Sequence, residues 1–328
     1  MNAYIYINYN NIVVLKDYLD VVKSALENLG YTCKYVKTIN GIDKKELLVF
    51  PLGIDAFHYY LKGYVNFIIW QQGATADESF MRNHSYIRKY ILNLIDIFVM
   101  KKSKYILFVS NYMREHYSKL ARTNFENKSY VMPCFNEQLD SDVFEKKDYT
   151  KKVFTYVGSL DLWQCFDKIA AAYVEIEKKV PNCYFKVLTF QEDDAKKILV
   201  EKGAHNYEVK KVPKEKVKEE LLECTYGFII RDDNIVNRVA TPTKMSSYLS
   251  SGVIPIFSKC LSDFYQLSSE YSFMICLNEE DGIEKVIDRV SNPVDVENIK
   301  FGIEDIFKKY YSKEKYIDAL TERLISHI

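Results

Sequence analysis

Short apolar segments alternate with helical periodicity along the whole chain of 328 residues. In the first half, apolar residues recur at helical spacing from Val14 to Leu29, and Gly30 follows where a left-handed cap would end a helix. A long helix is expected over 85–100, and Ser110 suits the N-cap of a shorter one. Apolar segments of strand length cover 4–9, 31–36, 47–50, 65–70, 105–109 and 130–132. This alternation predicts an α/β fold with a parallel sheet and helices on both faces.

The polar segment 136–152 has no sustained periodicity, and the same alternation starts again after it. Strands are expected at 153–157, 184–188, 226–230, 254–257 and 273–277, and helices near 166–180, 193–202, 214–224 and 243–251. The sequence therefore predicts two Rossmann-like units facing each other across a cleft. We expect the first unit over 1–150, the second over 151–302, and a C-terminal helix over 303–328 that packs back on the first.

Composition excludes several classes of protein. The 45 Lys and Arg residues balance 45 Asp and Glu residues, which argues against general nucleic-acid binding. No apolar segment has transmembrane length, and the N-terminus lacks the features of a signal peptide. The seven cysteines and five histidines are dispersed, which is typical of reduced thiols and argues against a metal site built by the protein. These features predict a cytoplasmic protein.

Common nucleotide motifs are missing from the sequence. The turn after the first expected strand holds Tyr9, Asn10 and Asn11 where a dehydrogenase would carry GxGxxG. No Walker A loop and no GxSxG element occurs. Any nucleotide site must therefore use another loop.

The segment 227–257 is the best candidate for such a site. Its expected strand leads into a polar loop with Arg231, and a helix is expected to begin near Pro242 and Thr243, directly before Lys244. A helix start with cations at the carboxyl end of a parallel strand is suited to bind a diphosphate. The alternative is that both cations are solvated or pair with the neighbouring aspartates.

Two segments carry a resemblance to a known family. PTKMSSYLSSGVIPI resembles the PTKxxEYLAxGxPVI element of bacterial GT-B glycosyltransferases, particularly the family-4-like enzymes that assemble capsule, O-antigen and exopolysaccharide. YVGSLDLWQCFDKIAAAYVEI resembles the glycine turn and helix that open their donor-binding domain. The resemblance implies a nucleotide-diphospho-sugar donor bound mostly to the second unit.

The resemblance also implies roles for individual residues. Gly158 would let the backbone approach the donor phosphates, and Arg231 and Lys244 would stabilise the leaving diphosphate without an obligatory metal or other cofactor. The remaining donor-binding candidates are Ser159, Trp163, Gln164, Asn237, Pro242, Thr243 and Ser247.

The chain departs from the family pattern at three positions. Ser247 stands where the family has the glutamate that holds the nucleotide ribose, and Val239 replaces the acidic residue eight positions earlier. A serine hydroxyl forms a weaker bond to a ribose than a carboxylate does, so nucleotide affinity or identity is open. Trp163 replaces part of the usual Lys-Gly element; it either stacks on the donor or fills an apolar gap.

In the first unit, the segment 70–85 is expected to line the acceptor side. Glu78 is the candidate base or acceptor contact, and Gln72, Gly73 and His84 complete the acceptor-side candidates. The alternative places Glu78 in the first turn of a helix that Asp77 or Ser79 caps.

Together these features predict a glycosyltransferase of bacterial surface polysaccharide synthesis, retaining and metal-independent, with a glycan or lipid-linked glycan acceptor. A non-catalytic nucleotide- or glycan-binding partner of another transferase, or a sugar-nucleotide epimerase, is the alternative. The basic and aromatic segment 308–316 either contacts the inner face of the membrane or packs on the first unit. The oligomeric state stays open.

Overall fold

The computed structural model describes residues 1–7, 12–278 and 282–328, without the side chains of 12–14. These residues form two compact units, and each unit is built from separate segments of the chain. Unit 1 comprises Met1–Asn136, Arg238–Thr241 and Ser312–Ile328, and unit 2 comprises Glu137–Asn237 and Pro242–Tyr311. The first boundary falls at the start of the polar segment 136–152.

Unit 1 contains a six-stranded parallel sheet in the order β2-β1-β3-β4-β5-β6. Its strands β3 and β4 are buried over their whole length, as in a sheet covered on both faces. The strands are β1 (Asn2–Tyr6), β2 (Thr32–Val36), β3 (Leu47–Phe50), β4 (Phe67–Gln71), β5 (Tyr105–Phe108) and β6 (Ser129–Val131). The expected turn at Tyr9, Asn10 and Asn11 lies outside the described residues.

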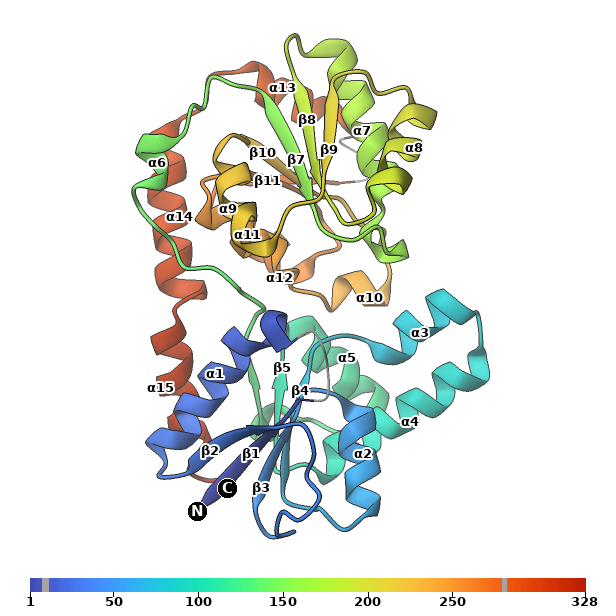
Figure 1. The fold of residues 1–328 in the computed structure, drawn as a ribbon, viewed down its shortest axis with the longest axis vertical. Helices are drawn as coiled ribbons and strands as arrows, with labels where there is room; N and C mark the ends of the chain where they lie inside the picture. Colours follow the sequence, from blue (N-terminus) through green and yellow to red (C-terminus); the bar gives the residue numbers. More distant parts are fainter. Residues whose placement is uncertain (8–11, 279–281) are drawn as a thin grey trace. The chain divides into compact units, whose positions relative to one another are not determined.

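Helices cover both faces of this sheet. The connection from β1 to β2 runs in one direction along the sheet, and those from β3 to β6 run in the other, so right-handed crossovers place their helices on opposite faces. Figure 1 shows α1 and α15 on one side and α2 and α4 on the other. The helices are α1 (Ile12–Asn28), α2 (Gly53–Leu61), α3 (Thr75–Asn83), α4 (Tyr86–Lys102), α5 (Asn111–Ala121) and α15 (Lys313–Leu324), with a 3-10 turn η1 (Glu126–Lys128).

The helix starts of unit 1 partly match the sequence predictions. Ser110 caps α5, because its hydroxyl accepts a hydrogen bond of 2.9 Å from the Met113 N–H. Ser85 caps α4 in the same way. The prediction that Asp77 or Ser79 caps a helix is wrong, because both residues lie inside α3, which begins after Ala74 without a side-chain cap.

Unit 2 contains a second six-stranded parallel sheet, in the order β12-β11-β10-β7-β8-β9. Its strands are β7 (Val153–Val157), β8 (Tyr184–Leu188), β9 (Tyr207–Lys210), β10 (Tyr226–Ile229), β11 (Ile254–Ser258) and β12 (Ile275–Leu277). Strand β9 was not predicted, because its sequence YEVK alternates charged with apolar residues over only four positions.

The sheet of unit 2 is also covered by helices on both faces. Figure 1 shows α7 and α8 on one side of it and α9 and α11 on the other. The helices are α6 (Val143–Lys146), α7 (Phe166–Lys179), α8 (Glu192–Lys202), α9 (Lys214–Leu222), α10 (Ile235–Arg238), α11 (Lys244–Ser250), α12 (Ser262–Ser268), α13 (Glu284–Ser291) and α14 (Val296–Tyr310), with a 3-10 turn η2 (Leu162–Gln164).

A close contact between Tyr248 and Gly227 fixes α11 on the sheet. A Cβ on Gly227 would lie 2.5 Å from the Tyr248 ring, so only glycine lets β10 and α11 approach this closely. The Tyr248 hydroxyl accepts a hydrogen bond from the Val157 N–H at 3.2 Å and donates one to the Phe228 carbonyl at 3.3 Å. Tyr248 thus joins the ends of β7 and β10 and sets the position of α11, which begins with Lys244.

A buried lysine anchors the other end of α11. Lys147 Nζ donates hydrogen bonds of 2.9 Å to the carbonyls of Leu221 and Ser251, which lie at the C-terminal ends of α9 and α11. A cation at two helix C-termini is favourable for the helix dipoles. Burial lowers the pKa of the Lys147 ammonium to about 7.

The predicted helix 303–328 is two helices that belong to different units. The N-terminal helix of this pair, α14, is part of unit 2, and α15 packs against α1 in unit 1. The Tyr316 ring stacks on the Phe135 ring with 5.8 Å between the ring centroids, and its centroid lies 6.1 Å from that of the Tyr130 ring. Because Tyr311 and Tyr316 are buried, they face the protein interior and are not available to a membrane.

None of the helices within the described ranges is long and apolar enough to span a bilayer.

Candidate functional site

The carboxyl ends of β7 and β10 meet at the centre of the unit 2 sheet. From β7 the chain continues to β8 on one side, and from β10 it continues to β11 on the other. Open parallel sheets bind ligands at this kind of switch point. Gly158 directly follows β7, and Arg231 follows β10 by two residues. Two of the predicted site residues therefore lie at the edge of the sheet where a ligand is expected.

The ammonium of Lys244 lies against the glycine turn. It is 4.0 Å from the centroid of the Tyr156 ring and donates a hydrogen bond to Gln164 Oε1. Gly158 has φ +134°, and a Cβ there would lie 2.8 Å from Lys244 Cε. Gly158 is thus required both by its backbone conformation and by the lysine beside it.

Arg231 is the second cation of this site, and only 8% of its surface is exposed. Its guanidinium donates a hydrogen bond to the Trp163 carbonyl at 2.5 Å, and its backbone N–H donates one to Ser258 Oγ at 2.8 Å. Burial lowers the pKa of Arg231. Burial and the positive charge of Arg231 together hold the pKa of Lys244 well below its usual value.

No acid forms an ion pair with either cation within the part of the chain that the structure describes, although the negative charge of Asp161 partly offsets the lowering of the Lys244 pKa. Neither Arg231 nor Lys244 forms an ion pair there, and Asp232 pairs instead with the exposed Lys168. The alternative in which both cations pair with the neighbouring aspartates is therefore not the observed arrangement. Arg231 lowers the pKa of Lys244, so the two cations repel each other, and a dianion bound between them could relieve this repulsion.

The other predicted donor residues surround these cations in different ways. The Ser159 hydroxyl donates to Asp161 at 2.7 Å, and the Ser159 carbonyl accepts a hydrogen bond from the Tyr156 hydroxyl. Trp163 is half-buried in η2. Asn237 is buried, and its side-chain amide donates to the Asp232 carbonyl at 2.9 Å, which holds the loop after β10 in shape.

The start of α11 lies next to Lys244. The Pro242 carbonyl accepts from the Met245 N–H, and the Thr243 carbonyl accepts from the Ser247 N–H, both at 3.0 Å. Thr243 is the N-cap of α11, but its side chain makes no capping hydrogen bond. Ser247 is half-buried one turn into the helix.

Val239 lies in unit 1, whereas Ser247 lies in unit 2. The Val239 carbonyl accepts a hydrogen bond of 2.7 Å from the Ser110 hydroxyl. Thr241 follows in the same segment and hydrogen-bonds the Val109 carbonyl at 3.2 Å. The segment 238–241 is thus held by the backbone around the start of α5.

Unit 1 contains a buried polar cluster that the sequence did not predict. It joins Gln71 at the end of β4, Asp96 of α4 and Tyr117 of α5. Gln71 Nε2 donates to the Tyr117 hydroxyl at 2.9 Å and to the Gly73 carbonyl at 2.8 Å, and the Tyr117 hydroxyl lies 3.1 Å from Asp96 Oδ2. The cluster fixes the turn between β4 and α3.

Burial raises the pKa of Asp96 to about 7, although its hydrogen bonds with Tyr117 and Gln71 act in the opposite direction. A Cβ on Gly53 would lie 2.5 Å from Asp96 Oδ1, so the helix α2 makes room for this carboxyl group. The signal in the sequence was a single acidic residue inside the apolar stretch around Asp96. Such a residue in a core helix needs hydrogen-bond partners.

The predicted acceptor-side residues lie near the same turn, with one exception. Glu78 is half-buried in the first turn of α3, and a Cβ on Gly73 would lie 2.3 Å from Glu78 Oε1. Gln72 Nε2 donates to the Pro51 carbonyl at 3.1 Å. His84, by contrast, is exposed and ends α3 in a left-handed conformation, so the structure does not bring it to Glu78.

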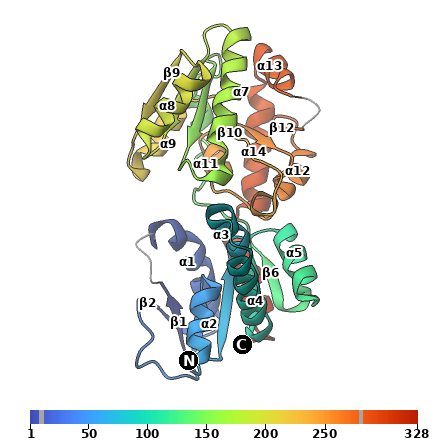
Figure 2. The ribbon, with the colours of Figure 1, turned by 90° about the vertical axis from the view of Figure 1, so that its right-hand side faces the viewer.

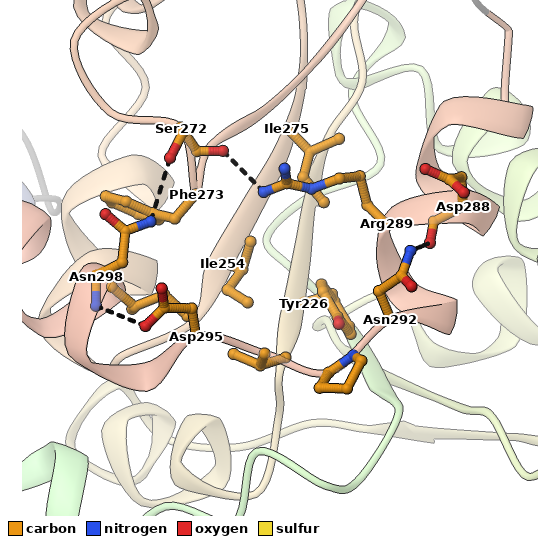
Figure 3. Close-up of a pocket in the computed structure, with 13 residues that line it drawn as sticks. Tyr226, Ile254, Ser272, Phe273, Ile275, Asp288, Arg289, Asn292, Asp295 and Asn298 are labelled. Carbon is orange, nitrogen blue, oxygen red and sulfur yellow. Dashed lines mark hydrogen bonds between the residues drawn. The ribbon is translucent and has the colours of Figure 1, made fainter.

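A cavity of about 390 Å³ lies elsewhere in unit 2. Tyr226, Ile254 and Ile275, which begin β10, β11 and β12, form its floor, and Arg289 reaches across it to donate to the Ser272 carbonyl at 2.8 Å (Figure 3). Tyr226, Ile254 and Ile275 lie at the amino ends of their strands. The cavity is thus at the opposite edge of the sheet from Gly158 and Arg231.

Comparison with known proteins gives matches only among solved structures: no family model matches the sequence, and no curated protein matches it. HepE from Anabaena, in complex with UDP and glucose, has a TM-score of 0.66 and 11% identity over 99% of this chain and 100% of that one. The lipopolysaccharide outer core galactosyltransferase WaaB has a TM-score of 0.62 and 11% identity, over 100% and 99% of the two chains.

The S. aureus protein TarM, in complex with fondaparinux, alpha-GlcNAc-glycerol and UDP, has a TM-score of 0.60 and 13% identity over 87% of this chain. This chain spans about half of TarM, since the match covers 55% of it. At these identities the likeness shows the fold. The chain has two units, each with a parallel six-stranded sheet, and shares the α/β fold of the GT-B glycosyltransferases.

Proposed function

We propose that this protein is a glycosyltransferase that takes its sugar from a nucleotide diphosphate donor. The observation that carries the proposal is the pair Arg231 and Lys244 at the carboxyl ends of β7 and β10, beside a glycine turn. The fold supports the same function, since HepE and TarM, which share it, were each determined with UDP.

In this proposal unit 2 binds the donor and unit 1 provides the acceptor side. Negative charge grows on the leaving diphosphate as the glycosidic bond breaks. Arg231 and Lys244 stabilise that charge because they are already in place and partly removed from water. Gly158 leaves room for the phosphates, and Ser247 hydrogen-bonds the ribose. Glu78 contacts the acceptor or accepts the proton of its hydroxyl.

We further propose the finer features that the family-4-like resemblance implies. The reaction retains the anomeric configuration and needs no obligatory metal, because the two cations supply the charge that a divalent ion supplies elsewhere. The acceptor is a glycan or lipid-linked glycan of bacterial surface polysaccharide synthesis. The protein acts in the cytoplasm, at or near the inner face of the membrane.

A second candidate is a non-catalytic module that binds a nucleotide or glycan for another transferase. It is favoured by Ser247 and Val239, which replace two acidic residues of the family pattern. The two functions differ in product formation. A transferase releases nucleotide when donor and acceptor are both present, whereas a binding module does not. An epimerase would convert the donor alone.

Thermal-shift measurements with UDP, GDP, CMP and dTDP test the donor site directly. A nucleotide at 100 times its Kd stabilises the folded protein by roughly 2.7 kcal/mol. We expect one nucleotide to raise the Tm of the wild type and to lose this effect in Lys244→Met. The matched control is Lys168→Met, which removes an exposed lysine from the same unit. Absence of a shift with all four nucleotides would contradict the proposal.

A further inference from the structure

The cavity at the amino ends of β10, β11 and β12 has one polar group in its floor, the Tyr226 hydroxyl. Tyr226 is 3% exposed, and its ring stacks on Phe154 of β7 with 5.1 Å between the ring centroids. Figure 3 shows Tyr226 among the side chains that line the cavity. Its hydroxyl forms no hydrogen bond with any residue that the structure describes. Because a tyrosine hydroxyl both donates and accepts, it is available to a molecule in the cavity.

The mouth of the cavity carries side chains with unused hydrogen-bonding groups. Arg289 donates through one guanidinium nitrogen to the Ser272 carbonyl at 2.8 Å, which leaves its other N–H groups for a ligand. The Asn292 amide nitrogen donates to the Asp288 carbonyl at 2.9 Å, so the Asn292 amide oxygen remains an acceptor. Neither the Arg289 guanidinium nor the Asp288 carboxylate forms an ion pair within the described ranges. The mouth therefore offers donors and acceptors from one short segment at the end of α13. Unit 2 is shown from another side in Figure 2, with α13 and α14 near β12.

The charges that line the cavity select among ligands. Two of the lining side chains are acidic, Asp288 and Asp295, and one is basic, Arg289. Asp295 accepts a hydrogen bond of 3.1 Å from the Asn298 N–H through one carboxylate oxygen, which caps α14. An anion would meet two carboxylates, and a cation would meet the guanidinium. A neutral molecule with both donors and acceptors avoids both repulsions.

The size and the floor of the cavity narrow the ligand further. Its volume of about 390 Å³ lies near the lower end of the range of about 300–1,000 Å³ that is typical of small-molecule sites. Ile254, Phe273 and Ile275 give the floor an apolar surface, and each is less than 5% exposed. A pyranose ring has C–H groups on its faces and hydroxyls around its edge. It therefore matches an apolar floor below a polar mouth.

We propose that this cavity binds a neutral pyranose sugar, with the ring on the apolar floor and its hydroxyls toward Tyr226, Asp288 and Arg289. All residues that line the cavity belong to unit 2. The cavity lies at the opposite edge of the sheet from Gly158 and Arg231, so it is separate from the proposed donor site. The inference rests on the cavity alone and does not depend on the transferase function.

Saturation-transfer difference NMR on the full chain tests the proposal. The probes are glucose, galactose and N-acetylglucosamine, each as the free sugar and as its methyl glycoside. We expect at least one of them to bind. Tyr226→Phe removes only a hydroxyl that has no partner in the described protein, so the fold is kept, and it should weaken this binding by about fivefold or more. The matched control is Tyr184→Phe, which changes the first residue of β8 outside the cavity and should bind like the wild type.

Further variants separate this cavity from the donor site. Val294→Phe places a larger side chain in the cavity and should abolish sugar binding, whereas Lys244→Met should keep it. Tyr226→Phe should keep the thermal shift with nucleotide, so a failure of this proposal is distinct from a failure of the proposed function. Glucuronate, which adds a carboxylate to the same ring, should bind more weakly than glucose. Binding of the methyl glycoside assigns the site to a sugar unit of a glycan, and binding of the free sugar alone assigns it to a monosaccharide. No binding by the wild type, equal binding by Tyr226→Phe and Val294→Phe, or a preference for glucuronate would overturn the proposal.

Discussion

The Lys244 side chain fills the space that a side chain at Gly158 would need: a Cβ on Gly158 would lie 2.8 Å from Lys244 Cε and 3.1 Å from its Nζ. The two residues come from the end of β7 and the first turn of α11. A change at either one therefore alters the other, and this coupling leads to specific predictions.

Gly158→Ala should weaken nucleotide binding by about tenfold or more, because the new methyl group displaces the Lys244 side chain. The control is Gly203→Ala, which also has a positive φ, +84°, but has nothing within 4 Å of the place that its new methyl group would take. Both variants should lose roughly 1–2 kcal/mol of stability through backbone strain. Isothermal titration calorimetry with the nucleotide found by thermal shift distinguishes them. Wild-type affinity in Gly158→Ala would contradict the coupling.

Arg231→Ala and Lys244→Ala should each lower the transfer rate by about 10²-fold or more, as expected for loss of one preorganised group that stabilises the transition state. Lys168→Ala, which removes an exposed cation paired with Asp232, should keep activity within a few-fold of the wild type. The assay is nucleotide release with donor and acceptor together. If both variants stay within a few-fold of the wild type, the two cations do not stabilise the leaving group.

Nucleotide binding should take up a proton over the pH range in which Lys244 is partly neutral. Burial and Arg231 lower the pKa of Lys244 in the free protein, and a bound diphosphate raises it again by compensating the charge. Affinity should therefore fall as pH rises through the lowered pKa. Titrations in buffers of different ionisation enthalpy measure the proton uptake. Lys244→Met should abolish the proton uptake that is due to the Lys244 ammonium.

Asp96→Asn should change how stability depends on pH. The folded-state pKa of Asp96 is about 7, whereas an unfolded aspartate has a pKa of about 3.9. The folded protein thus binds the extra proton between these values, and the wild type loses stability as pH rises from about 4 to about 7. The loss amounts to roughly 4 kcal/mol at most.

Urea denaturation at several pH values measures this effect. The stability of Asp96→Asn relative to the wild type should increase from pH 4 to 7 and then stay constant. Asp193→Asn, at an exposed position in the first turn of α8, is the control and should follow the wild-type profile. A constant difference between Asp96→Asn and the wild type across this range would show that Asp96 is not protonated in the folded protein.

Much of the fold follows from local patterns in the sequence. Continuous apolar segments such as β3 and β4 predict buried parallel strands, because both faces of such strands are covered. Ser85 and Ser110 mark helix starts because their hydroxyls bond backbone N–H groups only three residues ahead. The positions of Gly158 and Arg231 directly after apolar segments likewise predict that both lie at the carboxyl ends of strands, with Lys244 at the following helix start.

Other features depend on residues that are distant in the sequence. The Gln71, Asp96 and Tyr117 cluster joins a strand and two helices, and no short segment contains its hydrogen bonds. The return of α15 to unit 1 depends on the packing of Tyr316 against Phe135. The exposure of Ile87 could not be predicted for a related reason, since an apolar residue on a helix looks the same in sequence whether it faces a core or solvent.

The sequence by itself determined the two α/β patterns, the junction between them, the loops that carry Gly158 and Arg231 and the helix start at Lys244. It could do so because strand periodicity, helix caps and turn residues act over a few positions. Only the tertiary structure decided that Tyr248 packs on Gly227 and so brings Lys244 to Gly158. It also decided that Asp96 is buried and that Ile87 is exposed. Burial and the electrostatics that follow from it depend on which distant segments cover a side chain, and local sequence does not contain that information.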